Sequence, residues 1–238
     1  MLETSSVAMA AYNGGRYLPE QIDSILDQLG QNDELIVSYD ISSDNTLDIL
    51  DDYAAHDPRV KIFKNTKPGI VGNFNNAISK CTKDIVFISD QDDIWMPGKR
   101  EVMREVLNAS HADLAIHNVV HIDSEGNVIS GPLFQEYGIR AGLLRNFAKP
   151  RYSGCCMAFP ASTKRIIWPM PDSVVNYDHW IGFVCEALGN IVFVDDILLH
   201  HRLHGDNATV SRRPLGVVLQ QRMNLLHEYK KRRGELQS

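Results

Sequence analysis

Short apolar runs alternate with amphipathic segments through the first part of the chain. Apolar runs bounded by turn residues predict buried strands at 6–11, 34–39, 60–63 and 84–89. The segments between them carry apolar side chains at helical spacing, over 18–29, 44–55 and 71–79. Strands and helices in this alternation predict an α/β domain with a parallel sheet covered on both faces.

The pattern is less regular from residue 111 onward. Further strands are predicted at 113–121, 155–159 and 191–199, and helices at 178–188 and from residue 214. Residues 123–127 predict a tight turn into 128–130. The 238 residues show no internal repeat and no Gly/Ser linker, and they fit one large domain or one domain with a small appendage.

Polar side chains follow three of the predicted strands at the point where each strand ends. These are Tyr12 with Asn13, then Asp40, and then the run Asp90-Gln91-Asp92-Asp93. The carboxyl ends of parallel strands meet at one edge of a sheet, and ligands bind in the crevice beyond that edge. We therefore expect the three clusters to face one binding site.

The run from Asp90 to Asp93 is the most informative feature of the chain. Three carboxylates in four residues repel one another unless they are solvated or bound to a cation. Oxygen ligands on a short loop suit Mg²⁺ or Mn²⁺, which also take phosphate oxygens. The alternative is a solvated acidic turn. A phosphatase that uses Asp90 as its nucleophile is disfavoured, because three strands precede this loop.

Three segments in order, 8–14, 39–46 and 87–95, resemble family 2 glycosyltransferases. The resemblance runs from about Val7 to Asn207. It implies an inverting enzyme of the GT-A fold, with a Rossmann-like, mainly parallel sheet, helices on both faces and a smaller C-terminal acceptor-side region. The run Asp-Gln-Asp-Asp-Ile-Trp, with the later segment 202–207, is most similar to bacterial rhamnosyltransferase-type enzymes of surface-polysaccharide assembly.

The resemblance also implies a division of labour along the chain. Residues 1–110 would form the half that binds the nucleotide-sugar, and 111–210 the acceptor-binding and catalytic half of the same domain. Residues 211–238 would form a helical basic tail. The donor would be a dTDP- or UDP-sugar, and the acceptor a glycan or lipid-linked glycan in the assembly of O-antigen or capsule.

Site residues carry over one by one from the resemblance. Asp92 would hold the metal, and His204 would complete its shell near the diphosphate. Tyr12 would line the nucleobase pocket, Asp40 would accept a hydrogen bond from the base, Asp90 would contact the ribose and Asp93 would lie near the donor sugar. The nucleotide-sugar contacts are expected to come from Ala11, Tyr12, Asn13, Asp40, Asn73, Asp90, Gln91, Asp93 and Arg202.

Direct displacement with inversion needs a general base that deprotonates the acceptor hydroxyl. Asp178 is the candidate, because it opens a predicted helix and corresponds to the Asp before a helix in the family. His179 is an outside candidate and Glu186 a weaker one. The competing interpretation of Asp178 is a plain helix cap, since Asp is a favoured capping residue.

This sequence departs from the family pattern at three places. The family usually has two adjacent Asp residues and a Gly where this chain has Tyr39-Asp40-Ile41, so a catalytically impaired nucleotide-sugar-binding domain is the alternative function. Thr commonly stands where Ala11 is found, and an aromatic residue where His201 is found. A zinc site formed by His200, His201 and His204 is a competing use of the late histidines.

Composition adds a few limits. There are 24 Lys and Arg against 30 Asp and Glu, a net charge of −6, so no global basic field suits a nucleic acid. Four cysteines without CxxC spacing favour a reduced, cytoplasmic compartment, and no signal peptide or membrane-spanning run is apparent. The basic run 230–233 predicts either peripheral contact with the inner face of the cell membrane or a solvated helix end.

Overall fold

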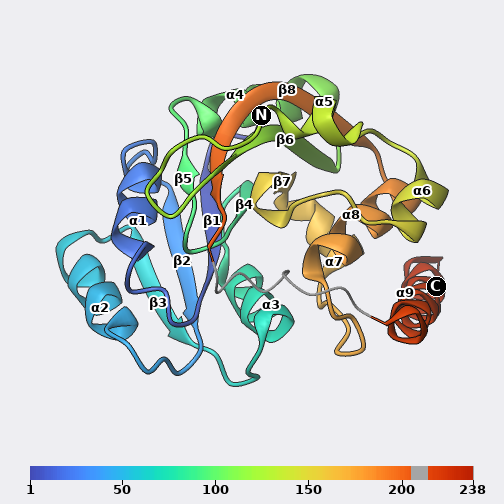
Figure 1. Cartoon of the computed structure of the whole chain (residues 1–238), viewed down its shortest axis with the longest axis horizontal. Coiled ribbons are helices and arrows are strands. Elements are labelled where there is room, and N and C mark those ends of the chain that lie inside the picture. Colours follow the sequence, from blue (N-terminus) through green and yellow to red (C-terminus); the bar gives the residue numbers. More distant parts are fainter. Residues whose placement is uncertain (205–213, 238) are drawn as a thin grey trace.

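A computed structural model describes residues 1–204 and 214–237 of the protein (Figure 1). An eight-stranded sheet is central, with strand order β3-β2-β1-β4-β7-β6-β8-β5. The strands are β1 (Ser5–Ala11), β2 (Glu34–Tyr39), β3 (Val60–Lys64), β4 (Ile85–Ser89), β5 (Ile94–Trp95), β6 (Leu114–Ile122), β7 (Met157–Pro160) and β8 (Ile191–Arg202). The helices are α1 (Leu18–Leu26), α2 (Thr46–His56), α3 (Ile70–Lys80), α4 (Lys99–Ser110), α5 (Leu133–Tyr137), α6 (Leu143–Ala148), α7 (Lys164–Ile167), α8 (Tyr177–Leu188) and α9 (Leu215–Gln237), with 3₁₀ turns at Gly154–Cys156 and Ala161–Thr163.

The first four strands confirm the pattern of the sequence. β1 pairs in parallel with β2 on one side and β4 on the other, and β2 pairs in parallel with β3. Residues of β1 are buried along the whole strand, as expected for a strand covered on both faces. Helix α3 packs against β1 and β2, and its buried side chains recur at helical spacing. This part of the molecule lies at the left and centre of Figure 1.

The later strands make the sheet mixed. Within the described residues, four of the seven pairings between strands are parallel, so the predicted parallel sheet is present but interrupted. The antiparallel pairings join β7 to β4 and β6, and β5, at the edge of the sheet, to β8. Two register shifts interrupt the pairing of β6 with β8.

Helix α4 and strand β5 were missing from the sequence expectations. Only Lys99, Met103 and Leu107 of α4 are buried, and this stripe is too narrow and too polar to stand out as an apolar period. β5 has only two residues. β8 continues beyond its predicted end at Leu199 and therefore carries His200, His201 and Arg202 back toward the loop after β4.

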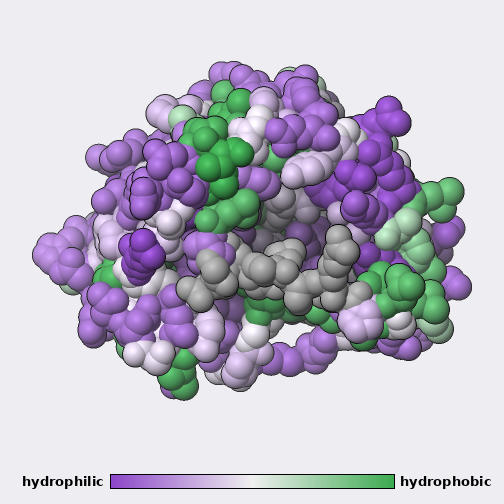
Figure 2. Space-filling model, in the orientation of Figure 1, coloured by the Kyte–Doolittle hydropathy of each residue, from purple (hydrophilic) through white to green (hydrophobic). Residues whose placement is uncertain are grey.

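Helix α9 docks on the body of the protein through buried Leu225 and a buried arginine. Arg232 donates hydrogen bonds to the backbone oxygens of Ile166 (2.8 Å), Trp168 (3.2 Å) and Pro169 (2.7 Å). The other three basic residues of the run 230–233 are exposed. Apolar surface gathers over α9 at the lower right of Figure 2, where Leu219 and Met223 are exposed. In the described part of the chain, every helix is too short or too polar to cross a bilayer.

Candidate active site

The acidic loop after β4 lies at the carboxyl end of the sheet, where the sequence placed it. Gln21 of α1 holds the start of the loop, since its amide donates to Ser89 Oγ (2.8 Å) and to the Asp90 carbonyl (2.9 Å). Gln91 holds the middle, because its side chain accepts from the Tyr12 N–H (2.7 Å) and donates to the Tyr12 carbonyl (2.8 Å). The loop is thereby attached to the end of β1.

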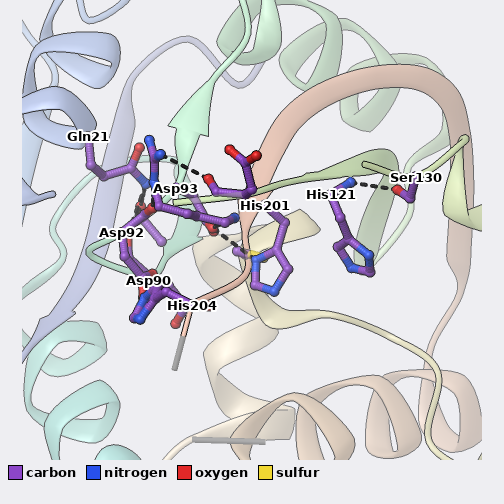
Figure 3. Close-up of polar contacts among 12 residues, drawn as sticks. Gln21, Asp90, Asp92, Asp93, His121, Ser130, His201 and His204 are labelled. Carbon is purple, nitrogen blue, oxygen red and sulfur yellow. Dashed lines mark hydrogen bonds and ion pairs between the residues drawn. The ribbon is translucent and has the colours of Figure 1, made fainter. Parts of the chain in front are cut away.

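Each carboxylate of the loop has its own polar partner. Asp92 Oδ2 lies 2.8 Å from His204 Nε2. Asp93 Oδ1 lies 2.9 Å from His201 Nδ1 and accepts from the Arg202 N–H at 3.0 Å. In Figure 3, these two Asp–His pairs lie side by side, with the dashed contact to His201 at the centre.

The third carboxylate, Asp90, is contacted by the other half of the molecule. Tyr177, at the start of α8, donates its hydroxyl to Asp90 Oδ1 at 3.1 Å. Gly154 makes room for this ring, because a Cβ there would lie 2.3 Å from the Tyr177 hydroxyl oxygen. The Tyr177 ring also packs on Phe74 of α3, with centroids 4.1 Å apart. Asp90 therefore lies where the two halves meet.

Crowding of the carboxylates shifts their proton affinities. Burial, together with repulsion from Asp93 and Asp92, raises the pKa of Asp90 to about 7. Burial and the Asp93 charge also raise the pKa of Asp92. The charge of His201 lowers the pKa of Asp93, and Asp93 in turn raises the pKa of His201 to about 10. Without a cation, Asp90 and Asp92 therefore keep their protons to a higher pH than ordinary aspartates do.

The residues of the loop fit a hard divalent cation. Asp92 and His204 lie within hydrogen-bonding distance of each other, and Asp90, with its raised pKa, is on the same loop. The Asp92 carboxylate and the His204 imidazole suit Mg²⁺ or Mn²⁺ together with phosphate oxygens. Among the described residues, Asp90 is not gathered with this pair into a group of donor atoms within 4.8 Å of one another. The metal candidates Asp92 and His204 are brought together as expected, although 112 residues separate them.

The competing zinc site from three late histidines is wrong. His200 and His201 are neighbours on β8, so their side chains point to opposite faces. His201 and His204 bind separate carboxylates. Among residues 1–204 and 214–237, these three imidazoles do not form a metal-binding group.

The residues predicted to contact the nucleobase lie at the ends of β1 and β2. Asp40 is buried and accepts from the Asn65 amide (2.7 Å) and the Gly69 N–H (2.9 Å). Asn73 donates to the Ala11 carbonyl at 3.1 Å. Asn13 has a left-handed backbone, and its side chain accepts from the Ser43 N–H at 2.8 Å.

Tyr12 is the most open of this group. Its side chain is 57% exposed, while its backbone is held by Gln91. An aromatic ring open to solvent at the end of a central strand is available for stacking.

Arg202 is placed differently from the expectation of a diphosphate ligand. It is buried, and its guanidinium donates to Glu20 Oε2 (2.6 Å) and to the backbone oxygens of Asp92 (3.0 Å), Asp123 and Ser124 (both 3.3 Å). In this conformation, Arg202 ties β8 to α1 and to the acidic loop. The segment that follows it in the family motif, 205–207, lies outside the described residues.

The candidate base Asp178 lies in the first turn of α8, next to Tyr177. Its Oδ1 accepts from the His179 N–H at 2.6 Å. The two weaker base candidates occupy structural positions. His179 is buried beside Arg222 with its pKa lowered to about 4, and Glu186 accepts hydrogen bonds from Asn146 and Tyr152. Of the three, Asp178 is the one adjacent to a residue that contacts the acidic loop.

Two buried side chains near the acidic loop, Lys99 and Cys155, were not predicted from the sequence. Lys99 is completely buried, donates to the Cys155 carbonyl at 2.8 Å and lies 4.3 Å from the centre of the Trp95 ring. Burial lowers its pKa to about 8. Cys155 lies 3.8 Å from His201 Nδ1. A Lys at a helix start and a Cys in a short apolar run resemble ordinary surface and core residues, so neither carried a signal.

A mixed sheet with an acidic loop at the end of its central strand is the arrangement of GT-A glycosyltransferases, and solved structures agree. The complex of S. aureus TarS 1-349 with UDP-GlcNAc matches 97% of this chain and 72% of that chain, with a TM-score of 0.69 and 16% identity. The mannosyltransferase PcManGT from Pyrobaculum calidifontis, in complex with GDP-Man and Mn²⁺, matches 87% of this chain and 58% of that chain, with a TM-score of 0.66 and 18% identity. The fold of this protein is therefore the GT-A fold.

The chain belongs to glycosyl transferase family 2, because the family model matches residues 6–167. Glycosyltransferase GlyG of Streptococcus pneumoniae serotype 4 is 35% identical over 217 residues, which are 85% of this chain and 71% of GlyG. The chondroitin synthase of Escherichia coli is 25% identical over 222 residues, which are 87% of this chain and 30% of that protein. The chain thus spans 71% of GlyG and 30% of the chondroitin synthase. It is a member of a glycosyltransferase family, and a chondroitin synthase is among its relatives.

Proposed function

We propose that this protein transfers a sugar, with inversion, from a nucleoside-diphosphate sugar to an acceptor hydroxyl, using Asp178 as the base. The proposal rests on the contact between Asp92 Oδ2 and His204 Nε2 at 2.8 Å. On the same loop, Asp90 accepts a hydrogen bond from Tyr177, at the start of α8. This contact supports the proposal, because it connects the acidic loop to the helix that carries the candidate base.

The donor half provides the nucleotide site. The ends of β1 and β2 present Tyr12, Asn13 and Asp40, and Asn73 supports them from α3 through the Ala11 carbonyl. A dTDP- or UDP-sugar is the proposed donor, and TarS was solved with UDP-GlcNAc. Asp92 and His204 would hold Mg²⁺ or Mn²⁺, which, when bound, supplies positive charge to the leaving diphosphate. PcManGT was solved with Mn²⁺.

The acceptor half provides the proton acceptor. Asp178 takes the proton of the acceptor hydroxyl as its oxygen attacks the anomeric carbon from the side opposite the diphosphate. Attack from that side inverts the configuration of the anomeric carbon. Asp178 suits the role because it is half-buried next to Tyr177, which contacts the acidic loop.

The proposed acceptor is a glycan or lipid-linked glycan of bacterial surface-polysaccharide assembly, and a rhamnosyltransferase-type donor is part of this proposal. The relationship to a chondroitin synthase supports a polysaccharide product. Exposed Leu219 and Met223 on α9, with exposed Lys230 and Lys231 further along the same helix, suit peripheral contact with an anionic membrane surface.

A screen of UDP-, dTDP- and GDP-sugars with and without Mn²⁺ tests donor and cation together. The matching sugar should raise the melting temperature by mass action, and EDTA should remove the shift. Asp92→Asn should lose the Mn²⁺-dependent shift, while Asp52→Asn, an exposed aspartate on α2, should keep it. An Mn²⁺-dependent shift of equal size in Asp92→Asn would refute the assignment of the cation site.

The alternative is a nucleotide-sugar-binding domain that has lost catalysis, which the departure at Tyr39-Asp40-Ile41 keeps open. Nucleoside-diphosphate release and the anomeric configuration of the product, followed by NMR with a glycan acceptor, separate the two. Donor binding without turnover, unchanged by Asp178→Asn, would favour the alternative.

A further inference from the structure

A second group of metal-binding side chains lies beside the Asp92–His204 pair. One carboxylate oxygen of Asp93, the thiol of Cys155 and one imidazole nitrogen of His201 all lie within 4.8 Å of one another. They come from the acidic loop, the 3₁₀ turn before β7 and strand β8. Asp93 and Cys155 are buried, whereas the His201 side chain is 23% exposed, so the imidazole is the most accessible part of the group.

The spacing of these atoms is close to that of a tetrahedral zinc site. Bond lengths of about 2.0–2.3 Å put ligand nitrogen and sulfur about 3.6 Å apart, and ligand nitrogen and oxygen about 3.3 Å apart. Here His201 Nδ1 lies 3.8 Å from Cys155 Sγ and 2.9 Å from Asp93 Oδ1. Shifts of a few tenths of an ångström would bring both distances to the ideal values.

The donor atoms differ in chemistry from those of the neighbouring pair. Asp92, Asp90 and His204 offer mostly oxygen, which suits Mg²⁺ and Mn²⁺, whereas a thiol beside an imidazole suits Zn²⁺. The second oxygen of Asp93 is buried and has no hydrogen-bond partner among the described residues. Asp93 therefore keeps an unused acceptor within the group.

We propose that Asp93, Cys155 and His201 bind Zn²⁺, with water as the fourth ligand, at a site separate from that of the sugar-transfer cation. Binding replaces the proton on His201 Nδ1 and the proton of the Cys155 thiol, and both protons pass to solvent. His121, whose ring centre lies 5.4 Å from that of His201, packs against the outer side of the group (Figure 3). The proposal does not depend on the sugar-transfer reaction.

Cobalt(II) is the probe, because a Co²⁺–thiolate bond gives a near-ultraviolet charge-transfer band that oxygen and nitrogen ligands do not give. One equivalent of Co²⁺ added to the metal-free, reduced full-length protein should produce this band, and Zn²⁺ should displace it. Cys155→Ser should abolish the band. Cys185→Ser, a matched change at a buried cysteine in α8, should leave it unchanged.

A second variant keeps the test independent of the folding of Cys155→Ser. His201→Asn should weaken Zn²⁺ binding, measured by calorimetry, at least tenfold, while Asp92→Asn should retain the cobalt band. Loss of sugar transfer in Asp92→Asn with the band intact would leave this inference standing. The absence of a band in the wild-type protein, or a band that survives in Cys155→Ser and is lost in Cys156→Ser, would overturn it.

Discussion

The proposed donor half, residues 1–110, and the proposed acceptor half, which begins at residue 111, are built in different ways. In the donor half, the site groups follow directly on parallel strands, and many of their contacts are with backbone atoms, as between Gln91 and Tyr12. In the acceptor half, the groups are side chains on α8, on β8 and just after β8, a strand with two register shifts against β6. The donor half therefore holds its site groups in place through the sheet. Each site group of the acceptor half is a separate side chain that a single substitution can remove.

The largest expected effect comes from removing one such group. Asp178→Asn should lower the rate of sugar transfer by about 10²–10⁴-fold, the usual contribution of a general base. The donor affinity should change less than twofold, because the nucleotide groups lie on the other half. Steady-state kinetics and calorimetric titration of the donor measure the two quantities. Wild-type turnover in Asp178→Asn would show that another group accepts the proton.

Arg202 joins the two halves, so its removal should destabilise the fold. Arg202→Met leaves the carbonyls of Asp92, Asp123 and Ser124 without their donor and should lower the free energy of unfolding by about 3 kcal/mol. Urea denaturation measures the loss.

Glu20→Gln is the matched control for Arg202→Met. Glu20 is 55% exposed, and the backbone oxygens remain to accept from Arg202, so this change should cost about 1 kcal/mol or less. Equal losses in the two variants would mean that the ion pair, rather than the bonds to the loop, carries the stabilisation.

Asp90 lies at the junction and gives a pH-dependent prediction. Its pKa of about 7 in the folded protein exceeds the ordinary value of 3.8, so the folded state binds more protons between these values. The free energy of unfolding of the metal-free protein should therefore fall as the pH rises through this range. Asn cannot ionise, so Asp90→Asn should melt at a higher temperature than wild type at pH 8 in EDTA, with the difference shrinking toward pH 5.

Mn²⁺ should reverse the order at pH 8, since only the wild type can offer the Asp90 carboxylate to the ion in addition to Asp92. Thermal melts at the two pH values, with EDTA and with Mn²⁺, supply all four comparisons. A variant that melts below wild type at both pH values without metal would contradict the raised pKa assigned to Asp90.

The difference between the two halves also explains which features could be predicted from the sequence. The strands at 6–11, 34–39 and 84–89 were predictable because local apolar runs coincide with buried parallel strands, and turn residues coincide with the ends of those strands. The acidic loop followed from its place after a strand. Tyr177 escaped notice because its role depends on Gly154, 23 positions earlier in the chain, leaving room for its ring.

Arg202 shows the limit of motif reasoning. The family motif placed it near the diphosphate, but the motif does not contain Glu20, which lies 182 residues away and accepts one of its hydrogen bonds. Lys99 is a similar case, because its burial depends on the contact with the Cys155 carbonyl from a distant turn. Contacts between distant segments decide what a charged side chain does, and no local pattern records them.

The smallest expected effect comes from a second bridge between the halves. Lys67, in the loop before α3, pairs with Asp172, in the loop before α8, and the two side chains are 63% and 69% exposed. Exposed pairs gain little because water screens them and both side chains lose rotamer freedom. A double-mutant cycle with Lys67→Ala and Asp172→Ala should give a coupling energy of about 0.5 kcal/mol or less in urea denaturation. A coupling as large as the effect of Arg202→Met would mean that the halves are joined at the surface as firmly as at the buried arginine.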